Sequence, residues 1–279
     1  MKSIFPGPPS LIQTWIAPYL ATLNMYELSK HFHIVLGASL FYQLLFIFSP
    51  FISKRFFTSY LTLNYSTRIK WDVHFVSMVQ SILISYLVLR CYQDDKLKED
   101  RLFGYSAYRG DIYSLACGYF LWDTITSFRY ISLFGIAFYL HGMAALSVFL
   151  FSYKPFLMYY GTAFLAFEFS TPFLNIHWFL DKLQMSGGLC QLINGIILLI
   201  VFFFVRIIWG LYAAFNVFSD IYYNLNVVPL YLALIYLTAN ILLNILNFYW
   251  YYKMLNALKK RLESPKNCIK MHKMSMTNT

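Results

Sequence analysis

The sequence has few charged residues. Asp, Glu, Lys and Arg make up only 12% of its 279 residues, while apolar residues reach 59%. Soluble globular proteins carry about 25% charged and about 45–50% apolar residues. Because long uncharged runs cover most of the chain, burial in a soluble core explains this composition poorly and a lipid environment explains it well. The composition excludes a soluble globular enzyme and a disordered protein.

Cysteine is also scarce. Cys91, Cys117, Cys190 and Cys268 are far apart and show neither CxxC spacing nor histidine partners. This pattern excludes a disulfide-stapled secreted domain and disfavours a zinc or redox site, so we expect four lone thiols and no metal. The first thirty residues lack the clean apolar run and small-residue cleavage site of a signal peptide. The first membrane helix must therefore act as the targeting signal.

Seven stretches reach or approach the roughly 20 apolar residues that a helix needs to cross a hydrocarbon core. They are His33–Phe51, Val73–Arg90, Ile112–Phe128, Ile131–Tyr153, Phe156–Leu180, Leu189–Leu211 and Val228–Tyr252. We expect an all-α membrane protein, a bundle of about seven transmembrane helices over residues 31–252. It lies between an N-terminal segment, residues 1–30, and a basic tail, residues 253–279.

The basic residues predict the orientation of this bundle. The net charge is +10, but Lys and Arg flank hydrophobic runs, which is typical of a membrane protein and not of a nucleic-acid-binding protein. A lumenal N-terminus and a cytosolic C-terminus place 13 basic residues on the cytosolic side and eight on the other. Seven of the 13 lie in the tail, which suits either a solvated stop-transfer end or attraction to anionic lipid headgroups. The sequon at Asn64 would then stay bare in the cytosol.

Ionisable side chains recur within the predicted spans, where each needs a partner or a watery cavity. Glu168, Thr171 and Asn175 fall at the spacing of one helical face, and Pro172 bends that helix. Arg206 needs a partner, for which Glu168 and Asp123 are the candidates. The alternatives for Arg206 are such an ion pair and contact with a lipid phosphate or a coenzyme A pyrophosphate.

Polar side chains in a membrane also serve simply to join helices. For the Glu168 face this explanation is as good as a cavity wall. Asn240, Asn244 and Asn247 share one face of the last span, and because amides do no proton chemistry we favour packing there. His141 lies in the middle of its span, where an imidazole suits a general base or a nucleophile, although a lone buried histidine is more often structural.

Several of these strings carry a resemblance to a known family. They are Ile69-Lys70-Trp71-Asp72, Gly118-Tyr119-Phe120-Leu121-Trp122-Asp123, the span around His141, residues 168–180, Asn194-Gly195 and Phe202-Phe203-Phe204-Val205-Arg206-Ile207. The chain resembles the TLC-domain family, which includes ceramide synthases and several non-enzymatic lipid-homeostasis proteins. The likeness covers about residues 65–260, and the string at 168–180 is its most specific part. It looks like the branch of small TLC-domain proteins found from fungi to animals.

The resemblance implies a TLC-type helical barrel and a lipid-related role, but not an enzyme. In ceramide synthases two adjacent histidines serve acyl transfer from acyl-CoA. Here the first position is His141 and the second is Gly142, which argues against ceramide synthesis.

We therefore expect a multi-pass endoplasmic-reticulum protein of membrane lipid homeostasis that binds an acyl chain or acyl-CoA in an intramembrane cavity. The expected lining is Asp123, His141, Glu168, Thr171, Asn175, His177, Asn194 and Arg206. The expected partners are membrane lipids, acyl chains or acyl-CoA, with no cofactor and no nucleic acid. One alternative is a ceramide-synthase-like, acyl-CoA-dependent acyltransferase with His141 as base or acyl carrier. Another is a membrane adaptor for secretory cargo.

Overall fold

The computed structural model describes residues 3–92 and 97–276, with side chains as far as Arg261. Within these residues the chain is helical and has no strand. The elements are α1 (Ser10–Thr22), α2 (Tyr26–Phe56), α3 (Thr58–Thr62), α4 (Tyr65–Cys91), α5 (Ala107–Arg129), α6 (Ile131–Phe134), α7 (Ile136–Phe151), α8 (Met158–Leu165), the 3-10 helix η2 (Ala166–Ser170), α9 (Thr171–Lys182), α10 (Leu189–Phe202), the π-helix η3 (Phe203–Ile208), α11 (Trp209–Tyr223) and α12 (Leu230–Met276). Cys268 and the basic side chains beyond residue 261 lie outside the described side chains.

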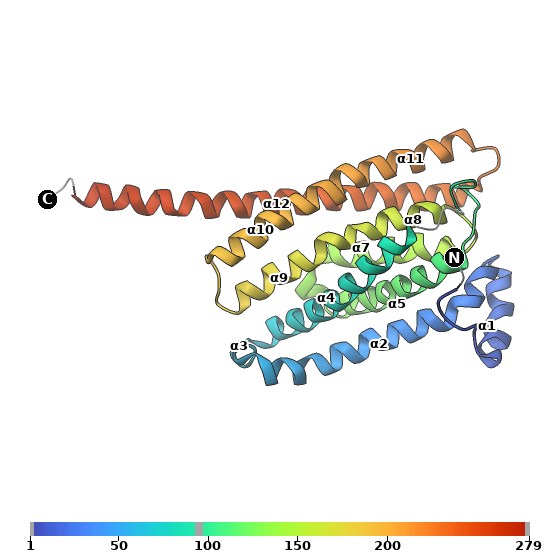
Figure 1. The fold of residues 1–279 in the computed structure, drawn as a ribbon, viewed down its shortest axis with the longest axis horizontal. Coiled ribbons are helices and arrows are strands. Elements are labelled where there is room, and N and C mark those ends of the chain that lie inside the picture. Colours follow the sequence, from blue (N-terminus) through green and yellow to red (C-terminus); the bar gives the residue numbers. More distant parts are fainter. Residues whose placement is uncertain (1–2, 93–96, 277–279) are drawn as a thin grey trace.

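The long helices run alongside one another in one bundle (Figure 1). Helix α1 and the connections at 152–157 and 224–229 lie at one end, which we call the N-terminal end. Helix α3 and the connections at 130–135 and 183–188 lie at the other end, beyond which α12 projects; we call this the tail end. Successive long segments therefore alternate in direction, and residues distant in sequence meet at the same depth of the bundle.

Four helical segments are long and apolar enough to cross a membrane. They are Tyr26–Phe56, Tyr65–Cys91, Leu189–Tyr223 and Leu230–Arg261. The all-α membrane-helix character expected from the sequence is thus confirmed, whereas the seven spans are not. In the described part of the chain, the third to fifth expected spans fail these criteria of length and hydropathy.

Charge and backbone breaks explain the difference. Helix α5 carries Arg109, Asp111, Asp123 and Arg129 within 23 residues, which lowers its hydropathy. The fourth expected span is split at Gly135, whose φ of 84° ends α6 and suits glycine because it has no Cβ. The fifth expected span divides into α8, η2 and α9. These segments still pack within the same bundle (Figure 1).

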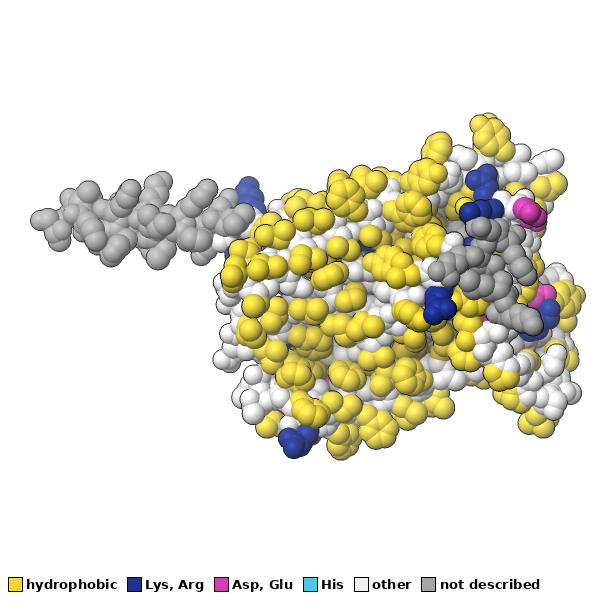
Figure 2. Space-filling view, in the orientation of Figure 1, with side chains coloured by type: hydrophobic (Ala, Val, Ile, Leu, Met, Phe, Trp, Pro, Cys, Tyr) yellow, Lys and Arg dark blue, Asp and Glu magenta, His cyan; other side chains and the backbone are white. Residues whose placement is uncertain are grey.

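The surface of the bundle is apolar over its middle. Figure 2 shows a broad hydrophobic face, with Lys and Arg gathered toward the two ends. Large apolar side chains are well exposed there, among them Leu40 at 60%, Ile200 at 52% and Ile245 at 60%. Soluble monomers rarely expose apolar patches of this extent, so this face fits a lipid environment.

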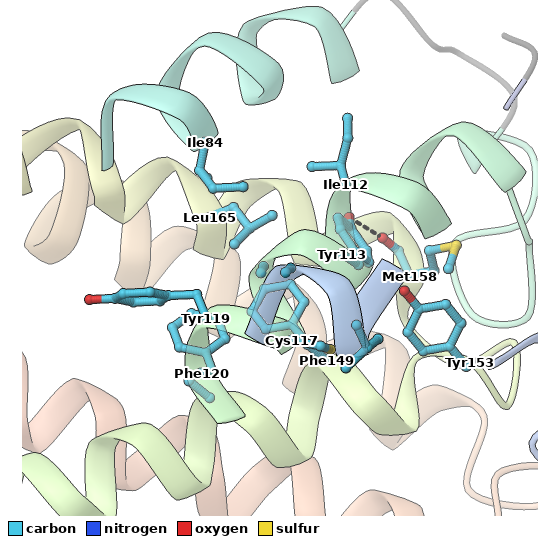
Figure 3. Close-up of a cluster of buried hydrophobic side chains, with 14 of the residues drawn as sticks. Ile84, Ile112, Tyr113, Cys117, Tyr119, Phe120, Phe149, Tyr153, Met158 and Leu165 are labelled. Atoms are coloured by element: carbon cyan, nitrogen blue, oxygen red, sulfur yellow. Dashed lines mark hydrogen bonds between the residues drawn. The ribbon is translucent and has the colours of Figure 1, made fainter. Parts of the chain in front are cut away.

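An aromatic core joins α4, α5, α7 and α8 (Figure 3). The rings of Phe120 and Phe149 stack at 5.6 Å, and the Tyr113 hydroxyl donates to the Met158 carbonyl at 2.8 Å. Gly142 brings α7 still closer to α5: a Cβ there would lie 2.8 Å from the Thr124 hydroxyl oxygen. This core holds α7 and α8 in place, and both helices contribute side chains to a neighbouring cavity.

Candidate functional site

A cavity of about 60 Å³ lies between α7, α8 and α12 and is closed by α5, η2, η3 and α11. One buried water needs only about 10–15 Å³ of such space, so the cavity holds more than a single water. Its lining runs from His141 to Ser152 along α7 and from Tyr236 to Asn247 along α12. At 1.5 Å per helical residue each stretch spans roughly 16 Å, so the cavity is elongated along the bundle.

The half of the cavity toward the N-terminal end is mainly apolar. Val148, Leu157, Phe164 and Val217 line it. Tyr236 adds a hydroxyl, but this group donates to the Val148 carbonyl at 2.7 Å and also contacts the Phe156 carbonyl at 3.1 Å. The Tyr236 hydroxyl therefore has its hydrogen-bond partners within the protein. A ligand in this half of the cavity would make chiefly hydrocarbon contacts.

The polar side chains of the lining gather in the half toward the tail end, beside apolar ones such as Leu243. Asn240, Asn244 and Asn247 of α12 and His141 of α7 line it. The Asn244 amide donates to the Asn240 side-chain oxygen at 2.9 Å, but Asn247 Nδ2 is buried without a hydrogen-bond partner. His141 Nδ1 also lacks a partner, and its ring lies edge-on to Trp250 at 5.3 Å. Buried polar atoms without partners are rare in folded proteins, and these two belong to side chains that line the cavity.

Arg206 reaches the cavity from the π-helix η3. Its Nε donates to the Phe167 carbonyl and to the Ser170 hydroxyl, at 3.2 and 2.9 Å, and its Nη2 donates to the Thr171 hydroxyl at 3.1 Å. Among the described residues Nη1 has no hydrogen-bond partner and is not sealed off. The wide turn of a π-helix, a feature frequent at functional sites, carries this arginine.

Glu168 lies on the 3-10 helix η2 and also lines the cavity. No ion pair within 4.0 Å joins it to Arg206 or to any other described residue. The Thr171 hydroxyl instead links the two, since it accepts from Arg206 and interacts with Glu168. The expected pair of Arg206 with Glu168 is thus not a contact ion pair within 4.0 Å, although the two side chains interact electrostatically. Arg206 is held instead by one carbonyl and two hydroxyls.

Three of the eight predicted lining residues meet at this cavity, namely His141, Glu168 and Arg206. Thr171 is not part of the lining, but its hydroxyl accepts a hydrogen bond from Arg206 and interacts with Glu168. Asp123 lies on α5 beside Gly142, whose added Cβ would be 3.0 Å from its Oδ2, and is outside the lining.

Asn175, His177 and Asn194 join helices and are also outside the lining. Asn175 Oδ1 pairs with His74 Nδ1 at 2.7 Å and so connects α9 to α4. Asn194 Nδ2 donates to the Phe173 carbonyl at 2.8 Å, between α10 and α9. His177 faces Gly195 of α10, where an added Cβ would lie 3.2 Å from its ring.

The expected common face of Glu168, Thr171 and Asn175 does not form. These residues belong to two elements, because the chain follows the 3-10 helix η2 up to Ser170 and begins α9 at Thr171. Pro172 therefore starts a helix, a position that proline suits, and does not bend one. A 3-10 turn has 3.0 residues against 3.6 in an α-helix, so the residues after it point to different sides.

Sequence reasoning gave the asparagines of α12 a packing role, yet all three line the cavity. The signal was present in their i, i+4, i+7 spacing, which places them on one face. The sequence does not show that this face borders a cavity and not a neighbouring helix.

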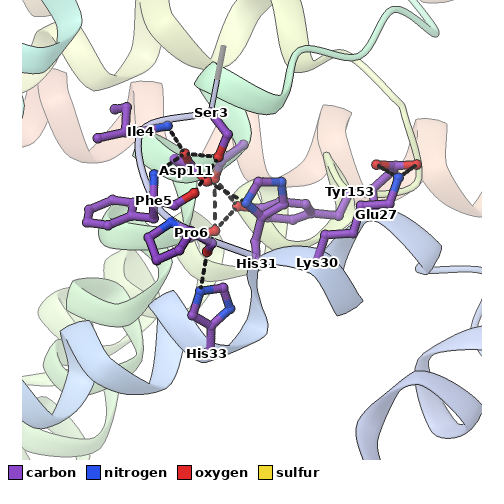
Figure 4. Close-up of polar contacts among 12 residues, drawn as sticks. Ser3, Ile4, Phe5, Pro6, Glu27, Lys30, His31, His33, Asp111 and Tyr153 are labelled. Atoms are coloured by element: carbon purple, nitrogen blue, oxygen red, sulfur yellow. Dashed lines mark hydrogen bonds and ion pairs between the residues drawn. The ribbon is translucent and has the colours of Figure 1, made fainter. Parts of the chain in front are cut away.

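A second polar cluster, not anticipated from the sequence, surrounds Asp111 at the N-terminal end (Figure 4). Its Oδ2 accepts from the Ser3 hydroxyl at 2.7 Å and from the backbone N–H groups of Ile4 and Phe5, at 2.5 and 3.1 Å. Its Oδ1 lies 2.7 Å from His31 Nδ1. Burial by itself raises the pKa of Asp111, but these hydrogen bonds outweigh it and hold the pKa below its ordinary value.

Comparison with known proteins identifies the family of this chain and the residues that the family's domain covers. The model of the TLC domain matches residues 70–256, which include every residue that lines the cavity. The chain belongs to the TLC-domain family. It is similar to an uncharacterized TLC domain-containing protein of Schizosaccharomyces pombe, with 43% identity over 95% of this chain and 91% of the relative.

Two further relatives span fungi and animals. An uncharacterized TLC domain-containing protein of Saccharomyces cerevisiae is 28% identical over 95% of this chain and 96% of its own length. TLC domain-containing protein 4-A of Xenopus laevis is 28% identical over 81% of this chain and 90% of its own. The expected family is thus confirmed, and the relatives' names specify a domain and no reaction.

Proposed function

We propose that this TLC protein acts in membrane lipid homeostasis by binding an acyl chain, carried by a lipid or by acyl-CoA, in the cavity between α7, α8 and α12. The observation that carries the proposal is the division of one elongated cavity into an apolar half and a polar half. An amphiphile has the same division, because its chain seeks hydrocarbon contacts while its head needs hydrogen bonds. The endoplasmic reticulum membrane, with a lumenal N-terminus and a cytosolic C-terminus, is the proposed location.

The apolar half suits the chain. Its apolar side chains need no hydrogen bonds from a ligand; they are Val148, Leu157, Phe164 and Val217. The polar half suits the head, since His141 Nδ1 and Asn247 Nδ2 lack partners and Arg206 keeps a nitrogen without one. A bound head would complete these hydrogen bonds and thereby remove the cost of leaving buried polar atoms unpaired.

Photo-crosslinking in membranes tests the proposal. A fatty acid with a diazirine in its chain and a terminal alkyne would be supplied to cells that make the full protein, and the labelled peptides mapped. We expect labels on residues of the apolar half. Leu243→Trp, which fills the cavity, should reduce them severalfold, whereas Ile245→Trp on the exposed face of the same helix should not.

Equal labelling of both variants would overturn the proposal, because the probe would then report only the surrounding bilayer. Deletion of the gene supplies an independent check. We expect altered lipid profiles in normal growth and under fatty-acid stress, and unchanged profiles in both would argue against the role.

An acyltransferase is the second candidate, favoured by one observation. The imidazole of His141 lines the cavity and therefore lies close to the place proposed for a bound head. A catalytic histidine acts by taking a proton or by attacking the acyl carbonyl, and it is commonly oriented by a hydrogen bond to its second nitrogen. In the described part of the chain no such bond orients His141.

Coenzyme A release decides between the two candidates. Purified wild type and His141→Ala would be incubated with oleoyl-CoA and a panel of amine and alcohol acceptors, and free thiol measured. We expect no release that depends on His141. Release by the wild type alone would establish the acyltransferase.

A further inference from the structure

We infer that the cavity recognises a single-chain lipid whose head is electrically neutral and both donates and accepts hydrogen bonds, such as a monoacylglycerol, and not a fatty-acid anion, an amine or acyl-CoA. This inference rests on the proposed function and specifies the ligand of the same site. It follows from three observations: the formal charges of the lining, the amides on α12 and the depth of the charged groups.

The formal charges of the lining cancel. Arg206 brings one positive charge and Glu168 one negative charge, linked through the Thr171 hydroxyl. A neutral head leaves this balance intact. An anionic or cationic head adds an uncompensated charge at a place where burial of an unpaired charge is costly.

The amides of α12 match a neutral head. Three carboxamides, Asn240, Asn244 and Asn247, face the cavity, and each has donors and an acceptor on one side chain. The Asn247 amide nitrogen and His141 Nδ1 are the buried atoms of this lining that lack partners. Hydroxyl groups, which donate and accept at once, can complete both.

The charged groups lie deep in the bundle. Arg206 is 7% exposed and lies near the rings of Phe167, in η2, and Phe202, whose centroids are 5.7 and 5.1 Å from its guanidinium carbon. A cavity of about 60 Å³ around these side chains leaves room for a small head.

Binding of four oleoyl or oleyl compounds tests the inference. The full chain, purified in a neutral detergent, would be titrated with 1-oleoylglycerol, oleate, oleylamine and oleoyl-CoA, and occupancy read by native mass spectrometry. The chain length is common to all four, so differences report the head. We expect 1-oleoylglycerol to bind at least about tenfold more tightly than the three charged compounds, since an unpaired buried charge costs more than 1.4 kcal/mol.

Glu168→Gln sharpens the test. It removes the negative charge and leaves Arg206 uncompensated, so the variant should gain affinity for oleate and reverse the order of oleate and 1-oleoylglycerol. Leu243→Trp and Ile245→Trp serve as the matched cavity-filling and surface controls. Because Glu168 makes no ion pair within the described chain, its neutral isostere should leave the fold intact, which a circular dichroism spectrum would verify.

The outcomes are distinct. Preference of the wild type for oleate, oleylamine or oleoyl-CoA, lost on Leu243→Trp, would overturn the inference while the proposed acyl-chain binding stands. Absence of any binding sensitive to Leu243→Trp would overturn both. An unchanged order of affinities in Glu168→Gln would also count against the inference, because the charge balance would then play no part.

Discussion

Two acidic side chains of the bundle, Asp111 and Glu168, have opposite surroundings. Asp111 receives hydrogen bonds from Ser3, Ile4 and Phe5 and pairs with His31. Glu168 interacts with the Thr171 hydroxyl, has no ion pair among the described residues, and faces a cavity. The difference separates two uses of a carboxylate in a membrane protein. A carboxylate that accepts several hydrogen bonds fastens segments together, and one that faces a cavity is available to a ligand.

The Asp111 cluster fastens the N-terminal segment to the bundle. Residues 3–5 have no helix of their own, and their backbone N–H groups find their acceptor on α5. His31, from α2, is 3% exposed and also lies 2.5 Å from the Tyr105 hydroxyl. The cluster thereby ties three distant parts of the sequence together, which accounts for its number of partners.

The largest expected effect is that of Asp111→Asn. The amide accepts fewer hydrogen bonds and no longer supplies the charge that faces His31, so we expect a loss of about 3 kcal/mol in the free energy of unfolding. Thermal unfolding in detergent, followed by tryptophan fluorescence, measures it. Glu168→Gln is the matched comparison and should change stability by less than about 0.5 kcal/mol. Equal losses in the two variants would abolish the distinction drawn above.

Gly142→His is expected to have the next largest effect. The substitution restores the adjacent pair of histidines, but a Cβ at this position lies 2.8 Å from the Thr124 hydroxyl oxygen and 3.0 Å from Asp123 Oδ2. We expect destabilisation of about 1–3 kcal/mol, as in other overpacked cores, with no gain in coenzyme A release. Gly142→Ala should lose less. A stable and catalytically active Gly142→His variant would show that this close approach of α7 and α5 is not a constraint.

The stability contributed by Asp111 depends on pH. Because the pKa of Asp111 is lowered in the folded chain, this contribution is present above the unfolded pKa of about 3.9 and is lost as pH falls through the folded value. The difference in melting temperature between wild type and Asp111→Asn should therefore narrow below about pH 4. Ser3→Ala keeps the carboxylate and should retain most of the pH dependence. A difference that stays constant with pH would contradict the assignment.

Thr171→Val should have a smaller effect on stability than Asp111→Asn or Gly142→His. It removes the hydroxyl between Arg206 and Glu168 at nearly constant volume, which costs about 1 kcal/mol. Because the charged groups would no longer be linked, binding of 1-oleoylglycerol should weaken by more than this stability change suggests. Thr62→Val, at an exposed threonine, is the control for loss of a hydroxyl. Unchanged binding in Thr171→Val would show that the link does not organise the site.

Much of the fold could be predicted from the sequence. Long apolar runs specify helices. The runs at 33–51 and 73–90 fall within α2 and α4, and the run at 228–252 falls within α12 apart from its first two residues. The run at 156–180 was expected to be one helix and is three segments. Local composition does not reveal this break, since a 3-10 turn differs from an α-turn only in its hydrogen-bond register.

The candidate site was predictable only in part. His141 and Arg206 stood out because an ionisable side chain within an apolar run is costly, and both line the cavity. The same reasoning chose Asn175 and Asn194, which pair with His74 and with the Phe173 carbonyl. The energetic cost of a polar side chain within an apolar run indicates that the residue needs a hydrogen-bond partner. It does not indicate whether that partner belongs to the protein or to a ligand.

The sequence by itself determined that this is a helical membrane protein of the TLC-domain family, because hydropathy and local strings are properties of the chain. Tertiary structure alone decided which polar groups remain unpaired. Arg206 and Glu168 sit on a π-helix and a 3-10 helix, whose phases depend on the packing of their neighbours. Hydrogen-bond partners 35 or more residues apart, such as Arg206 and Thr171, are likewise set by that packing.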